Sequence, residues 1–215
     1  MSGTPDRFFI RRGLLAGALA AAATPVWAVA RREVVTILGD SITAGLGLPA
    51  AQALPAQLQA ALQRLAVAAV VRGAGVSGDT SAAGLERVGF SVQADTDVCL
   101  VALGGNDLLQ GLDPQETRAN LDGIIRRLQA RRIGVVLAGL TAPPAVGRGY
   151  ARDFGAVFPA VAKARGVALY PDLLAGVGLN PALHQPDAIH PNAAGVKVMA
   201  ARLAPIVARA LRVRR

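Results

Sequence analysis

The chain has 215 residues, of which 53% are hydrophobic and 17% are charged, so it can bury the core of a single domain and is not a disordered chain. Its formal net charge of +9 makes nucleic acid a partner to consider. The basic residues are mostly scattered, however, and their few clusters fall on one predicted helix and its end or in the tail. This distribution favours a solvated basic face, and we expect no nucleic-acid partner.

Residues 1–30 have the pattern of an export signal. Positive charge precedes a small apolar stretch at 14–23, and the Ala-Val-Ala triplet at 28–30 fits the small-x-small rule for cleavage by a signal peptidase. The arginine pair at 11–12 resembles a twin-arginine signal, with the ordinary secretory route as the alternative. Because the apolar stretch is shorter than the ~20 residues of a membrane span, we predict an exported, periplasmic or secreted domain at 31–215 without a stable span.

Apolar runs and amphipathic segments alternate along the mature chain. In chain order they predict a strand at 34–38, a helix at 54–65, a strand at 67–71, a helix at 79–88, a strand at 98–103, a helix at 114–130, a strand at 133–140, a helix at 150–165, a strand at 167–170, and a helix at 193–211 with a bend at Pro205. Strands that are apolar throughout, each followed by a helix, predict an α/β fold: a three-layer α/β/α sandwich around a five-stranded parallel sheet. In a flavodoxin-like order, 2-1-3-4-5, the loops after the strands meet at one edge, where such sheets bind ligands.

The loops after the strands contain residues suited to acyl transfer. Ser41 follows the first strand, and a serine needs a base within hydrogen-bond reach, which in turn needs an acceptor that fixes its tautomer. The mature chain has two histidines, and His190 has a carboxylate three residues earlier, that of Asp187. A short turn can place Asp187 on Nδ1 and leave Nε2 for Ser41. These residues predict a catalytic Ser-His-Asp triad, with His184 as a surface or rim residue.

A tetrahedral intermediate also needs donors aimed at its oxyanion. The backbone N–H of Gly78, the side-chain amide of Asn106 and the backbone N–H of Ser41 at a helix start are the candidates.

Other interpretations of these residues are weaker. Asp172 follows the fifth strand but lacks the short spacing to His190, and Asp40 beside a helix start is suited to capping a turn. Asp187 and His190 could be two metal ligands, but no third ligand keeps a matching spacing, so we expect no metal. The lone Cys99 lies in an apolar run and is predicted to be a buried, inert thiol.

The stretch from Gly73 to Gly78 fits the G-x-G-x-x-G pattern of dinucleotide-binding proteins, with Asp95 and Asp97 about 20 residues further on. A nicotinamide or flavin oxidoreductase is therefore the alternative from another reaction class. It is disfavoured because the pattern follows the second predicted strand, and because both acids precede the third strand instead of ending one. A catalytically silent binding module on the same fold is a third alternative.

Four ordered blocks resemble the signature of the SGNH (GDSL) hydrolases, in particular the bacterial periplasmic acyl-CoA thioesterase I/lysophospholipase/arylesterase subgroup. The blocks are Gly39-Asp40-Ser41, Gly78, Gly104-x-Asn106-Asp107 and Asp187-x-x-His190. Ile42 stands where the family name has leucine.

The resemblance implies the SGNH hydrolase fold and a serine esterase or thioesterase of arylesterase, acyl-CoA thioesterase or lysophospholipase type, working through an acyl-enzyme without a cofactor. The substrate would be a small ester or thioester with an acyl chain, or, as the alternative within the family, an O-acetylated carbohydrate. The resemblance also implies that loops at 107–113 and 143–148 border an acyl pocket, with Leu108, Leu109, Leu112, Pro143 and Pro144 as substrate-binding residues.

Overall fold

The computed structural model describes residues 1, 3 and 31–214, without the side chain of Pro144. The chain divides into two units, Met1–Arg31 and Arg32–Arg215, and the fold described below is that of the second unit. The predicted signal at 1–30 lies outside the described residues, apart from positions 1 and 3. None of the helices in the described part combines the length and apolar character needed to cross a bilayer.

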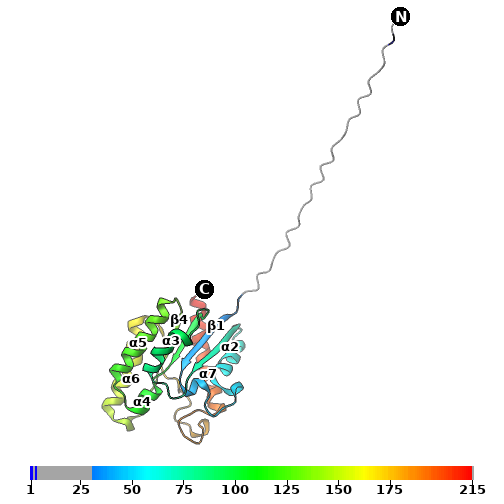
Figure 1. The fold of residues 1–215 in the computed structure, drawn as a ribbon. Coiled ribbons are helices and arrows are strands. Elements are labelled where there is room, and N and C mark those ends of the chain that lie inside the picture. Colours follow the sequence, from blue (N-terminus) through cyan, green and yellow to red (C-terminus); the bar gives the residue numbers. More distant parts are fainter. Residues whose placement is uncertain (2, 4–30, 215) are drawn as a thin grey trace. The chain divides into compact units, whose positions relative to one another are not determined.

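Five parallel strands form one sheet in the order β2-β1-β3-β4-β5 (Figure 1). They are β1 (Glu33–Gly39), β2 (Ala69–Gly75), β3 (Val98–Ala102), β4 (Gly134–Ala138) and β5 (Ala168–Tyr170). β1 buries six of its seven residues and β3 buries all five, as strands covered on both faces do. The predicted architecture and strand order are confirmed.

Helices cover both faces of the sheet (Figure 1). One face packs on α2 (Leu54–Arg64) and α7 (Ala193–Val213), and the other on α3 (Ser81–Ser91), α5 (Pro114–Ala130) and α6 (Arg148–Arg165). Successive strand residues alternate between the two cores: Ile37 joins the first and Leu38 the second. Packing on both faces of the sheet therefore fixes the positions of the strand ends.

The bounds of several elements differ from the prediction, and those of β2 differ most. β2 begins at Ala69 and continues to Gly75, because its register with β1 runs through to the pair Gly39 and Gly75. The glycines of this strand, which locally favour a loop, let neighbouring elements approach: a Cβ at Gly75 would lie 2.4 Å from the Ala44 nitrogen. The last helix, α7, continues through Pro205 to Val213, two residues beyond its predicted end.

Two short helices follow strands at the edge where the predicted site residues gather. α1 (Ser41–Ala44) follows β1, and α4 (Gly105–Gln110) follows β3, where a loop was predicted from 107 onward. α4 begins after Gly104 and ends at Gly111, both with positive φ, and its six residues are too few for helical periodicity to show in the sequence.

Candidate active site

Ser41 is the first residue of α1, immediately beyond the end of β1. The Asp40 carboxylate caps this helix by accepting from the Ile42 backbone N–H at 3.0 Å. The Ser41 residue is 8% exposed. Strand, cap and short helix thus fix the direction of the hydroxyl.

His190 and Asp187 lie on the loop before α7 and come to the same place. His190 Nε2 lies 2.8 Å from Ser41 Oγ, and His190 Nδ1 lies 2.7 Å from Asp187 Oδ2. The other carboxylate oxygen of Asp187 accepts from the backbone N–H groups of Ile189 and His190, both at 3.0 Å. Ala188 has a φ of 57°, a left-handed conformation uncommon for a residue with a Cβ, which closes the turn. The three side chains of the predicted triad therefore form one hydrogen-bonded series.

Two carboxyl groups of the site have displaced pKa values, in opposite directions. The backbone and ring hydrogen bonds from His190, followed by the Ile189 N–H, lower the pKa of Asp187 to about 2. Burial raises the pKa of Asp40 to about 6. Asp187 is therefore ionised at neutral pH, whereas Asp40 is poorly solvated and caps the turn.

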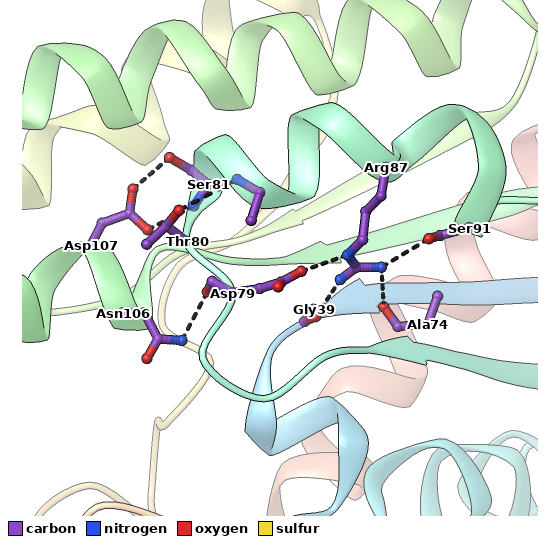
Figure 2. A network of polar contacts seen from close by, with 10 residues as sticks. Gly39, Ala74, Asp79, Thr80, Ser81, Arg87, Ser91, Asn106 and Asp107 are labelled. Carbon is purple, nitrogen blue, oxygen red and sulfur yellow. Dashed lines mark hydrogen bonds and ion pairs between the residues drawn. The ribbon is translucent and has the colours of Figure 1, made fainter.

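The three predicted N–H donors belong to Ser41, Gly78 and Asn106, which line one cavity. Among the described residues, the backbone N–H groups of Ser41 and Gly78 have no protein acceptor. Gly78 adopts a φ of 88°, which favours glycine. The Asn106 amide donates one hydrogen to the Asp79 carbonyl oxygen at 2.8 Å, which leaves its second N–H for another acceptor (Figure 2).

A cavity of about 260 Å³ opens beside Ser41, and Gly78, Asn106 and His190 also line it. Its remaining wall is mostly apolar, and its aliphatic members are Ile42, Leu46, Leu108, Leu109, Leu140, Leu174 and Ile189. Such a space fits a hydrocarbon chain whose carbonyl group sits at the serine.

Of the predicted substrate-binding residues, Leu108 and Leu109 line this cavity. Leu112 and Pro143 do not: the Leu112 carbonyl oxygen accepts from the Tyr150 hydroxyl at 2.8 Å, and Pro143 is exposed. The Pro144 side chain lies outside the described part of the chain.

The sequence analysis did not assign five of the aliphatic lining residues to the pocket, namely Ile42, Leu46, Leu140, Leu174 and Ile189. Leu140 had a usable signal, since it is the last residue of the predicted fourth strand and the ends of the strands meet at this sheet edge.

The other candidates take structural positions. His184 Nδ1 lies 3.0 Å from the Asn180 carbonyl oxygen at the rim of the loop, and Asp172 accepts from the Leu174 N–H at 3.0 Å in its own turn. In the G-x-G-x-x-G stretch, Gly73 packs against Pro55 within β2. Asp95, the acid that pattern requires, binds both terminal nitrogens of Arg72. These groups are already used in packing and pairing.

Comparisons with known proteins agree with this geometry. Residues 37–198 match the GDSL-like lipase/acylhydrolase family. The chain is 37% identical over 183 residues to Esterase TesA of Pseudomonas aeruginosa, covering 85% of this chain and 90% of that protein. It is 38% identical over 164 residues to thioesterase 1/protease 1/lysophospholipase L1 of Escherichia coli, covering 76% of this chain and 77% of that protein. The crystal structure of AlinE4, an esterase of the SGNH-hydrolase family, has a TM-score of 0.71 and 42% identity, covering 84% of this chain and 97% of that one. The chain therefore belongs to the GDSL-like lipase/acylhydrolase family and has the SGNH hydrolase fold.

Proposed function

We propose that this protein is a serine hydrolase that cleaves carboxylic esters or thioesters of an acyl chain through an acyl-enzyme. The proposal depends above all on the hydrogen-bonded series from Ser41 to Asp187 at the mouth of an apolar cavity. The names of the relatives, an esterase and a thioesterase/lysophospholipase, support the same reaction class.

His190 takes the proton from Ser41 Oγ as that oxygen attacks the substrate carbonyl carbon, and Asp187 stabilises the imidazolium that forms. The Ser41 and Gly78 N–H groups and the free Asn106 N–H bind the oxyanion. His190 then donates its proton to the departing alcohol or thiol. Water enters, loses a proton to His190 and attacks the acyl-enzyme, which releases the acid and restores Ser41.

The wall of the cavity favours an acyl substrate over the carbohydrate alternative. Aliphatic side chains make up most of its surface beyond the reacting groups, and they offer few partners for the hydroxyl groups of a sugar. We therefore expect activity toward acyl chains longer than acetate.

A fluorophosphonate probe and a p-nitrophenyl ester series from acetate to palmitate, run beside acyl-CoA, test the proposal. We expect the probe to label the wild type but not Ser41→Ala, and esters longer than acetate to be hydrolysed fastest. Labelling or full turnover by Ser41→Ala would exclude the serine mechanism. A maximum at acetate, with acetylated sugars preferred, would identify a deacetylase instead.

We further propose that residues 1–30 direct export of the 31–215 domain to the periplasm. The charged start, apolar stretch and small-x-small triplet support this. Fractionation of cells expressing the full chain should recover a protein that begins at Arg31 outside the cytoplasm. Replacing Arg11 and Arg12 by lysine should block a twin-arginine route and leave the ordinary secretory route working. Recovery of an uncleaved cytoplasmic protein would contradict the proposal.

A further inference from the structure

Arg87, on the inner side of α3, binds several groups through one guanidinium (Figure 2). Its Nε donates to Asp79 Oδ2 at 2.5 Å, and its terminal nitrogens donate to the carbonyl oxygens of Ala74 at 2.9 Å and Gly39 at 2.8 Å and to the Ser91 hydroxyl at 3.0 Å. Gly39 and Ala74 lie at the ends of the neighbouring strands β1 and β2. One side chain therefore joins two strand ends to the loop that follows β2.

Two of these contacts lead to the donors around Ser41. Asp79 adjoins Gly78 in the chain, and its carbonyl oxygen accepts from the Asn106 amide at 2.8 Å, so the position of Asp79 sets the positions of both donors. Gly39 lies two residues before Ser41 and is held through its own carbonyl oxygen. We propose that Arg87 is a positioning residue that sets the spacing of the oxyanion donors, acting through Asp79 and Gly39. This inference rests on the proposed function, because it concerns the same reaction.

The Arg87–Asp79 pair has the burial expected of a group with such a role. The two side chains are only 18% and 12% exposed, whereas the Arg152–Asp153 pair on the surface is 77% and 54% exposed. A guanidinium removed from water is costly unless its N–H groups have acceptors, and here four different groups accept from it. Arg87 does not line the cavity, so it reaches the reaction only through the residues it holds.

Lysine cannot replace this guanidinium. A planar fork donates in several fixed directions at once, whereas an ammonium is a point charge on a flexible stem. Arg87→Lys therefore keeps the charge and removes the geometric constraint, which makes it the informative substitution. Asp79→Asn is the second variant, because it keeps the shape of the side chain and weakens the same contact.

A matched control is available on the opposite edge of the sheet. Arg165, at the end of α6 just before β5, makes a bidentate salt bridge with Asp122 of α5. These two side chains are 29% and 27% exposed. Arg165→Lys makes the same substitution in a pair of similar kind far from Ser41.

The experiment measures kcat and KM on a p-nitrophenyl ester for the folded mature domain, with folding checked by circular dichroism. We expect Arg87→Lys and Asp79→Asn to lower kcat roughly 10- to 100-fold, up to the loss typical of one oxyanion donor, with KM within about twofold. Arg165→Lys should keep the kcat of the wild type.

A second measurement separates positioning from general destabilisation. In an Asn106→Ala background the donor that Asp79 holds is already gone, so Arg87→Lys should lower kcat far less than in the wild type. An equal loss in both backgrounds, an unchanged kcat in both folded variants, or an equal loss in Arg165→Lys would overturn the inference. If Ser41→Ala also kept full activity, the proposed function itself would fail, whatever Arg87 does.

Discussion

At the scale of single residues, the site contains two carboxyl groups, those of Asp187 and Asp40, whose pKa values differ because their surroundings differ. Asp187 receives hydrogen bonds from two backbone N–H groups and the His190 ring, which hold its pKa near 2, whereas burial raises the pKa of Asp40 to about 6. The first carboxylate stays ionised wherever a serine hydrolase works. The second changes charge in the physiological range.

Asp187→Asn should abolish most of the activity without affecting the fold. An amide keeps the size of the carboxylate but cannot stabilise an imidazolium and can hold His190 in the wrong tautomer, so we expect kcat to fall roughly 10²- to 10⁴-fold. Steady-state kinetics and thermal unfolding in parallel test this. A kcat within threefold of the wild type would remove Asp187 from the mechanism.

Asp40→Asn should change how stability depends on pH. Because the folded-state pKa of Asp40 lies above the ordinary 3.8, its protonation stabilises the fold, and this contribution is present below pH 4 and lost as pH rises through about 6. The shift corresponds to about 3 kcal/mol at most. Asparagine keeps the cap on Ile42, so the wild type should lose stability relative to the variant between pH 4 and 8. Urea unfolding across that range measures the difference, and parallel curves for the two proteins would contradict it.

At the scale of elements, the loop carrying His190 is fastened to the end of α1 by Gln185. The Gln185 side-chain amide donates to the carbonyl oxygens of Leu46 at 2.8 Å and Pro191 at 3.1 Å, and the Gln185 backbone N–H donates to the His190 carbonyl oxygen at 2.8 Å. Gln185 therefore links the segment that contains His190 to the segment that follows Ser41.

Gln185→Ala should therefore lower kcat about 10-fold and the free energy of unfolding by about 1 kcal/mol. The hydrogen bonds of the side-chain amide are lost, and the loop can then move relative to α1. Gln57→Ala is the control, because the Gln57 side chain makes a similar bond to the Ala51 carbonyl oxygen at 2.6 Å within the α2 region. The test compares kcat of the two variants. Equal kcat values for Gln185→Ala and Gln57→Ala would show that the Gln185 hydrogen bonds do not affect turnover.

The sequence predicted the elements whose patterns are local. The apolar runs of β1 and β3 and the bounds of α5 at Pro114 and Ala130 followed from periodicity and punctuation. The extension of β2 to Gly75 and the short helix α4 did not, because the first depends on pairing with β1 and the second has too few residues to show a period.

The site divides in the same way. Ser41, Asp187 and His190 were predicted because their chemistry and spacing are written in the chain, whereas Leu174 and the contacts of Arg87 depend on which side chains meet after folding. Neither the spacing of residues along the chain nor their type predicts these contacts.

At the scale of the whole molecule, Cys99 lies at the centre of the sheet, fully buried within β3. Burial raises the pKa of its thiol to about 12, so the reactive thiolate is scarce and no reagent can reach it in the folded state.

We expect Ellman's reagent to leave the native protein unmodified and to modify one thiol per chain after unfolding in urea. The rate of modification in dilute urea should then follow global unfolding and not local opening. Stopped-flow absorbance beside circular dichroism tests this. Rapid modification of a protein that keeps its full activity would contradict it.

Ser41 and His190, the proposed nucleophile and base, are 149 positions apart in the sequence, near opposite ends of the folded domain's chain. During synthesis, the serine therefore leaves the ribosome long before its partner exists, and it remains an ordinary alcohol throughout elongation. Only when the stretch before α7 has emerged and that last helix has docked does the hydroxyl gain its proton acceptor. If the proposed triad is correct, a prematurely terminated product lacking His190 should have no hydrolase activity.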